Sequence, residues 1–182
     1  RQDMTLSDRN RWFRRIQPEQ RAIIYTRYAK GWYDTEGCLS AVIVAALHRE
    51  LRYQEARRHM SLPALATRPL QRLPYAAYLP WDEAVTILNP FIKNPDPELR
   101  TLALQTLMGV VRFHRDKLSE ALTLVHARRN EQDPVRCAML RGLAELPPGA
   151  WQLDHLEDLA QIISEALDAA DFSYATSHAI GE

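Results

Sequence analysis

Two stretches of this chain repeat one another, and they decide its fold. Residues 93–107 read KNPDPELRTLALQTL, and residues 129–143 read RNEQDPVRCAMLRGL. Within them, Arg136 follows Arg100 at a distance of 36 residues. A repeat of this length is typical of stacked two-helix units, because one helix pair cannot bury its own apolar face. The sequence therefore predicts an all-α protein, an α-α superhelix of about four to five two-helix units with no β-sheet.

Capping residues mark the second helix of each repeat. Asp96, which precedes a proline, suits the N-cap of a helix over residues 96–113. Asp133, also before a proline, predicts the same start for a helix over residues 134–146. The two helices should therefore begin in the same way.

The 36-residue register also predicts which residues form the core. We expect a buried seam made of the apolar positions that recur in both copies, namely Leu99, Leu102, Ala103, Leu107, Val135, Ala138, Leu140 and Leu143. A third unit starts near Leu153, and in the same register Tyr174 and Ala175 take the places of Leu102 and Ala103. The sequence stops in mid-repeat, which favours a fragment of a longer array.

The rest of the chain is helical but less regular. Residues 1–60 predict irregular N-terminal helical repeats, including a helix over residues 35–48 that is apolar on most sides. Residues 61–80 contain prolines every five or six positions, too dense for one helix, and predict a connecting segment. Residues 81–182 hold the regular repeats, the last one truncated.

The stretch from Asn94 to Ala103 resembles a HEAT repeat, in particular the bacterial kind also described as PBS-lyase HEAT-like. The resemblance rests on the short Pro-Asp turn, on Leu99-Arg100 at the start of the second helix, and on the alanine that follows. Residues 81–146 carry it. It implies paired antiparallel helices in a right-handed superhelix, with the second helices lining the concave face.

The resemblance also bears on how neighbouring units are joined. In many HEAT arrays an aspartate and the motif arginine form a ladder between units. Here Asn94 and Asn130 stand six residues before Arg100 and Arg136. Because asparagine carries no charge, the resemblance predicts a weakened ladder.

Charge and composition narrow the class of protein. Residues 1–72 hold 14 lysines and arginines against 7 acids, and residues 73–182 hold 9 against 16, so the halves carry +7 and −7. No apolar run approaches the roughly 20 residues of a membrane span, so no membrane partner is expected. Cys38 and Cys137 lie far apart in apolar patterns, which indicates free thiols in a cytoplasmic protein.

No catalytic or metal-binding motif is visible. His114, Asp116 and His126 are too widely spaced for one metal, and the pair His155 and Asp158 supplies too few ligands. The sequence has no glycine-rich phosphate loop and no nucleophile elbow. We therefore expect no enzyme activity, no metal and no cofactor.

The predicted rotation of the second helices leaves one strip of side chains away from the seam. We expect it to contain Thr101, Gln105, Met108 and Arg112 on one helix, with Cys137 and Arg141 beside Thr101 and Gln105 on the next. A mixed polar, lightly basic strip suits an extended acidic peptide or a partner helix. The favoured function is a non-catalytic protein–protein interaction scaffold.

Two other functions remain open. HEAT-like alkylpurine DNA glycosylases show that such a solenoid can bind nucleic acid, and the candidate basic patch here is Arg11, Arg14, Arg15, Arg57 and Arg58. The zero net charge and acidic C-terminal half argue against that function. A bilin lyase is suggested only by the PBS-lyase name, which often follows the repeat and not an activity.

Overall fold

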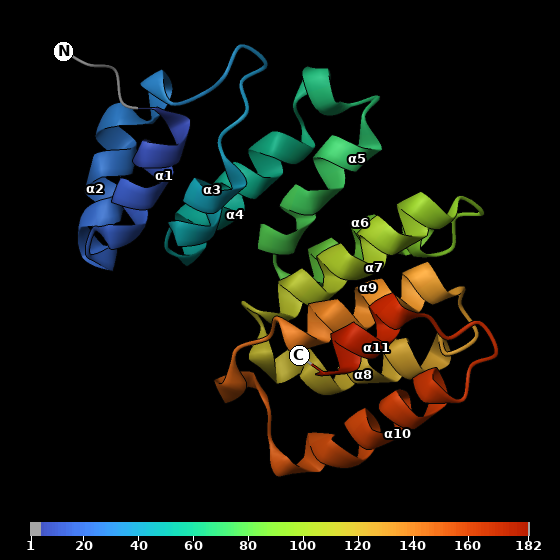
Figure 1. The fold of residues 1–182 in the computed structure, drawn as a ribbon. Helices are drawn as coiled ribbons and strands as arrows, with labels where there is room; N and C mark the ends of the chain where they lie inside the picture. Colours follow the sequence, from blue (N-terminus) through green and yellow to red (C-terminus); the bar gives the residue numbers. More distant parts are fainter. Residues whose placement is uncertain (1–4, 182) are drawn as a thin grey trace. The chain divides into compact units, whose positions relative to one another are not determined.

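The computed structural model describes residues 5–181 (Figure 1). Over this range the chain is helical, with α-helices α1 to α11 joined by short 3₁₀ turns and no strand. The all-α prediction is confirmed. The chain divides into two compact units, with unit 1 ending at Leu79 and unit 2 beginning at Pro80. No helix among the described residues is both long and apolar enough to cross a bilayer.

Unit 1 is built around one apolar cluster. Its α-helices are α1 (Leu6–Arg15), α2 (Pro18–Tyr28), α3 (Ala41–Ala46), α4 (Arg49–Met60) and α5 (Pro69–Arg72). Three 3₁₀ turns, Ala29–Gly31, Pro63–Leu65 and Leu73–Tyr78, complete it. Helix α3 packs against both α1 and α4. Phe13, Leu39, Ile43 and Val44 are fully buried between them.

The helix expected over residues 35–48 is wrong in its first half, since α3 begins only at Ala41. The preceding loop is held by Asp34, whose Oδ1 accepts hydrogen bonds from the backbone N–H groups of Glu36 (2.9 Å) and Cys38 (2.7 Å). Gly37 has a φ of 80°, a left-handed conformation that ends a helix and favours glycine. Side-chain hydrogen bonds to the backbone therefore compete successfully with the helical pattern.

The proline-rich residues 61–80 carry short helices of their own. Leu65, Leu73 and Leu79 are buried, and the turn Leu73–Tyr78 packs against α4. Because unit 1 extends to Leu79, nearly all of this segment lies within that unit. The three-part division of the chain stays a prediction.

Unit 2 consists of three consecutive helix pairs. They are α6 (Trp81–Ile92) with α7 (Pro97–Val111), α8 (Leu118–Ala127) with α9 (Asp133–Ala144), and α10 (Leu156–Leu167) with α11 (Tyr174–Gly181). Helix α9 packs between α7 and α11, and α8 packs against α10. Figure 1 shows the second helices α7, α9 and α11 side by side. The second helices therefore form one layer of unit 2.

The two predicted caps have different outcomes. Asp96 is the N-cap of α7, and its Oδ1 accepts the backbone N–H of Glu98 at 2.8 Å, which confirms the prediction. Asp133 does not cap α9. It is the first residue of that helix, the N-cap position belongs to Gln132, and no side chain caps this end. The Asp133 carboxylate instead binds the start of α11.

Most of the predicted seam is buried. Ala103, Leu107, Val135, Ala138, Leu140 and Leu143 are buried, whereas Leu99 and Leu102 are half-buried. Leu99 and Leu102 are the third and sixth residues of α7, and Val135 and Ala138, at the same positions of α9, are buried. Helix α9 has a second helix packed on each side, whereas α7, within residues 5–181, packs against only one second helix.

The 36-residue register predicted for the third helix pair, α10 and α11, is wrong. Tyr174 is 85% exposed and Ala175 is also exposed, while Thr176 and Ala179 are buried. These two stand at the third and sixth positions of α11, as Val135 and Ala138 do in α9. The step from the start of α7 to the start of α9 is 36 residues, but the step from α9 to α11 is 41. The 36-residue step does not continue because α10 and the connections before and after it are all longer than their counterparts around α8.

Candidate functional site

The predicted strip on the second helices is exposed in part. Gln105 on α7, Arg112 at the C-cap of α7 and Arg141 on α9 are exposed to solvent, and Thr101 is half-buried. Met108 is fully buried, so its placement on the strip was wrong. The structure thus brings together a smaller polar set than the sequence predicts.

Met108 is buried because α7 and α9 approach closely at that level. A Cβ atom added to Gly142 of α9 would lie 2.6 Å from the Cβ of Met108, too close for any real pair of side chains. The missing side chain of Gly142 thus makes room for Met108. Cys137, also expected on the strip, is buried in the same layer of helices, so its placement was wrong as well.

The first motif arginine joins two consecutive helix pairs. Arg100 donates from Nη1 to the backbone oxygens of Asn94 (2.9 Å) and Pro95 (2.8 Å), and from Nε to the Glu131 carboxylate (3.1 Å). Glu131 belongs to the loop between α8 and α9 and also pairs with Arg128 at 3.0 Å. Arg100 therefore links the start of α7 to the next pair.

The second motif arginine makes the corresponding bonds. Arg136 is buried; it donates from Nη1 to the backbone oxygen of Glu131 and from Nη2 to Asp171 at 2.5 Å. Asp171 lies in the loop before α11. This hydrogen bond from Arg136 lowers the pKa of Asp171. Both motif arginines thus bind a carbonyl five residues back and an acid from the following pair.

Bonds between an arginine and an acid therefore join consecutive helix pairs of unit 2. The asparagines at positions 94 and 130 predict that such a ladder is weakened. The acids are Glu131 and Asp171, which lie 31 and 35 residues after their arginines. Because the two spacings differ, no fixed sequence period identifies them. This is the feature of unit 2 that sequence reasoning missed.

Asp133 completes the connection between α9 and α11. Its Oδ1 accepts hydrogen bonds from the Thr176 hydroxyl (2.7 Å) and the Ser173 backbone N–H (3.3 Å). Burial raises the pKa of this carboxyl, but the bonds from Ser173 and Thr176 outweigh burial, so the pKa is lowered. Asp133 is therefore a carboxylate that anchors the last helix.

His126 of α8 and His155, which directly precedes α10, join the first helices of neighbouring pairs. His155 Nδ1 accepts the backbone N–H of Gln152 at 3.1 Å, so its Nε2 carries the proton and donates to Ser119 Oγ at 3.1 Å. His126 Nδ1 lies 3.2 Å from a carboxylate oxygen of Glu165. Among residues 5–181 no three histidine, cysteine or acidic side chains are grouped as metal ligands.

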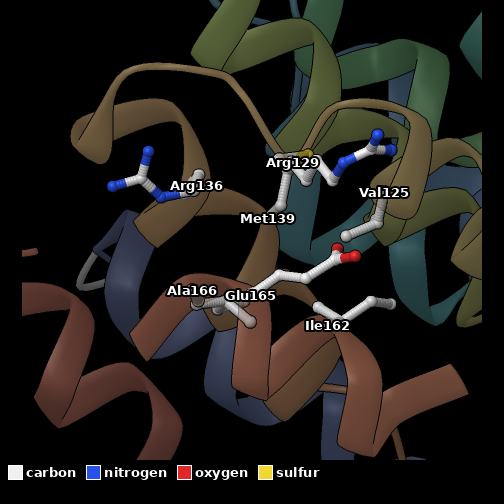
Figure 2. Close-up of a pocket in the computed structure, with 8 residues that line it drawn as sticks. Val125, Arg129, Arg136, Met139, Ile162, Glu165 and Ala166 are labelled. Atoms are coloured by element: carbon white, nitrogen blue, oxygen red, sulfur yellow. The ribbon is translucent and has the colours of Figure 1, made fainter. Parts of the chain in front are cut away.

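A small cavity lies between α8, α9 and α10. It is lined by Val125, Arg129, Arg136, Met139, Leu140, Ile162, Glu165 and Ala166, and its volume is about 20 Å³. Figure 2 shows the Glu165 carboxylate extending toward Val125 and Arg129, while the Arg136 guanidinium points away from it. A space of this size accommodates about one water molecule, so it is too small for an organic ligand.

The candidate basic patch of unit 1 is split by the structure. Arg11, Arg14 and Arg15 are exposed and line an open groove with Val42 of α3. Within residues 5–181, none of these three guanidinium groups is in an ion pair. Arg58 is engaged elsewhere, since its Nη2 lies 2.8 Å from Glu55 Oε2.

Arg57, the remaining member of the proposed patch, is exposed on α4 with its guanidinium carbon 5.9 Å from the centre of the Tyr53 ring. The groove of α1 is lined by neither Arg57 nor Arg58. The structure therefore groups three of the five predicted arginines.

Unit 1 contains a buried polar network that the sequence does not reveal. Glu55 of α4 accepts hydrogen bonds from the hydroxyls of Tyr25 and Tyr33 and from Arg58. Burial raises the pKa of Glu55, but the hydrogen bonds from Arg58 and Tyr25 outweigh it and lower the pKa. The Glu55 carboxylate is therefore paired with one guanidinium and two hydroxyls, and removing one of these partners would leave a buried charge without full compensation.

His59 occupies the next turn of α4 and is also fully hydrogen-bonded. Its Nδ1 donates to the Glu55 backbone oxygen at 2.7 Å, and its Nε2 accepts the Leu39 backbone N–H at 2.8 Å. Burial lowers the pKa of this imidazole. His59 thus fastens the loop before α3 to α4 as a neutral side chain.

Comparison with known proteins gives no relative for this chain. It matches no protein-family model, no curated protein and no solved structure. The functional argument therefore depends on the residues and contacts described above.

Proposed function

We propose that this protein is a non-catalytic interaction scaffold built from HEAT-like repeats, and that unit 2 presents its second helices to a protein partner. The observation that supports this proposal is the repeated arginine bond between helix pairs. Arg100 and Arg136 each bind a carbonyl of their own turn and an acid of the next pair. A bond that recurs between neighbouring helix pairs sets the distance between them, and an extended binding surface requires such regular spacing.

The proposed binding face consists of Gln105, Arg112 and Arg141, with half-buried Thr101 beside them. The two arginines make this face positively charged, whereas unit 2 as a whole carries seven more acids than bases. A lightly basic helical surface suits an acidic segment of a partner, either extended or helical. The charge of the two arginines and the spacing between α7 and α9 would together recognise such a partner.

The experiment places a photo-crosslinking amino acid at Thr101 and compares the unmodified face with the double variant Gln105→Glu and Arg141→Glu. We expect a specific crosslinked protein that disappears in the double variant while the melting temperature stays unchanged. Lys93→Glu is the matched control, because Lys93 is exposed at the end of a first helix. Crosslinking that persists in the double variant would show that the partner binds elsewhere.

A second function is favoured by a separate observation, the groove of unit 1 with its three arginines. Unpaired guanidinium groups at a groove suit the phosphates of a nucleic acid. The variant Arg11→Ala, Arg14→Ala, Arg15→Ala should then weaken binding of a labelled oligonucleotide, measured by fluorescence anisotropy. The affinity of the unmodified protein should also fall steeply as salt is raised. Binding that is absent or insensitive to salt would exclude this function.

A further inference from the structure

Unit 1 contains a second groove with aromatic walls, separate from the groove of three arginines. Its volume is about 270 Å³, just below the range of about 300–1,000 Å³ that is usual for small-molecule sites. Trp32, Tyr33 and Tyr75 supply three rings, and Arg9, Cys38 and Ser40 supply polar groups. Asp34 also lines the groove, and its Oδ1 already accepts the backbone N–H groups of Glu36 and Cys38. Aromatic rings with a few polar side chains are the usual lining of a ligand site.

The rings are held in place by the surrounding structure. The Tyr75 hydroxyl donates to the Leu39 backbone oxygen at 2.8 Å, and its ring stacks on His59 with centroids 3.9 Å apart. The Tyr33 hydroxyl donates to Glu55 at 3.2 Å. Because these rings are already ordered, a ligand that packs between them loses little affinity to ordering the site.

Trp32 and Tyr33 are fixed on their other sides as well. The Trp32 ring meets Phe13 edge-on at 5.4 Å, and the Arg58 guanidinium lies 4.2 Å from the centre of the Tyr33 ring. The buried polar network around Glu55 therefore also shapes the walls of this groove.

Arg9 is the one cation among the residues lining the groove, and most of its donors are unused. Its Nη2 makes a long bond of 3.5 Å to the Trp32 backbone oxygen. Its Nε is buried and has no acceptor among residues 5–181. No described carboxylate forms an ion pair with it. An unpaired guanidinium beside aromatic rings favours a carboxylate, which it can bind through two parallel hydrogen bonds.

We propose that this groove binds a small aromatic carboxylate, with the ring among Trp32, Tyr33 and Tyr75 and the carboxylate on Arg9. An aromatic ring gains from edge or offset contacts with such walls. Cys38 is a neighbour of the ligand and not a nucleophile. Burial, together with Asp34 and Glu36, raises the pKa of its thiol and so disfavours the reactive thiolate.

The reaction of Cys38 with a thiol reagent reports on ligand binding, because Cys38 is half-buried in the groove wall. Cys137, in contrast, is buried in unit 2. The full chain is titrated with phenylacetate, and the rate of Cys38 labelling by a thiol reagent is followed by mass spectrometry. Cys137 serves as the internal reference. Phenylacetamide, which lacks the charge, and acetate, which lacks the ring, are the matched ligands. We expect saturable protection of Cys38 by phenylacetate and little by the other two.

The variants test the role of Arg9 directly. Arg9→Gln should weaken phenylacetate binding by about tenfold or more, and Arg11→Gln, on the same helix and exposed, should leave it unchanged. Calorimetry gives both affinities. Equal protection by phenylacetamide, no saturable protection by phenylacetate, or an unchanged affinity in Arg9→Gln would each overturn the proposal. The ligand comparison uses the unmodified chain, so it decides the matter even if Arg9→Gln fails to fold.

Discussion

At the scale of single residues, close packing determines which side chains reach the surface. Met108 belongs by helical rotation to the exposed side of α7, yet it is fully buried because Gly142 lets α9 approach. In unit 1, His59 is buried with both ring nitrogens bonded. Substituting Gly142 or His59 should therefore change the stability of the protein measurably.

We expect Gly142→Ala to destabilise the protein although alanine is the better helix former. The added methyl would lie 2.6 Å from the Cβ and 2.9 Å from the Cγ of Met108, so α7 and α9 would have to move apart. Overpacking of this kind costs about 1–3 kcal/mol. Chemical denaturation measures it. Gly31→Ala is the control, since a Cβ there has nothing within 4 Å. Equal effects at both glycines would contradict the close contact.

His59 predicts a pH dependence of stability. Because burial lowers the pKa of His59 in the folded protein, the unfolded chain binds this proton at higher pH than the folded one. The free energy of unfolding should therefore be fully retained above about pH 6.5, the ordinary histidine pKa, and should fall as the pH drops below it. His59→Gln should flatten this dependence. Equal slopes for both proteins in urea unfolding would refute it.

At the scale of elements, unit 2 is held together by apolar contacts within the layer of second helices and by the arginine bonds between pairs. Leu107 and Leu143 occupy equivalent positions of α7 and α9 and are buried. Arg136 is one of the few buried charged residues among residues 5–181. The two kinds of contact can be tested separately.

Truncating Leu107 or Leu143 to alanine should cost about 2–5 kcal/mol each, because a buried leucine leaves a cavity that its surroundings fill only in part. Leu102→Ala is the matched comparison and should cost less, since Leu102 is half-buried. Thermal and urea unfolding give the differences. If both buried positions tolerated alanine with unchanged melting, the shared register of α7 and α9 would be wrong.

Arg136→Ala should destabilise unit 2 by about 1.5–3 kcal/mol, the usual range for hydrogen bonds to charged groups. The loss removes the donor to the Glu131 carbonyl and to Asp171 together. In a double-mutant cycle with Asp171→Asn, the two changes should be less than additive, because both break the same bond. Full additivity would show that this bond between helix pairs does not contribute to stability.

At the scale of the whole molecule, the chain combines two compact units of opposite charge. Unit 1 carries 14 lysines and arginines against 7 acids, and unit 2 carries 9 against 16. Each unit has its own buried residues, with Ile43 and Val44 at the centre of one and Leu104 and Leu107 in the other. Separate cores allow the units to lose structure separately.

Hydrogen exchange can test this separation. In Leu107→Ala, amide exchange should accelerate throughout unit 2, while the amides of α3 and α4 in unit 1 keep their protection. His59→Gln should produce the reverse pattern. Exchange that accelerates equally in both units after either substitution would show that the chain unfolds as one cooperative body.

The sequence by itself determined the helical class and the place of α7 and α9. Apolar spacing and the Asp96 cap are local properties, so they can be recognised without knowledge of the neighbours. Only the tertiary structure decided which acids bind Arg100 and Arg136, that Met108 is covered, and that Glu55, His59 and three aromatic rings meet in unit 1. These features depend on contacts between residues far apart in the sequence, from 16 positions between His59 and Tyr75 to 36 between Leu39 and Tyr75. Such contacts follow from how helices pack and have no fixed period in the sequence.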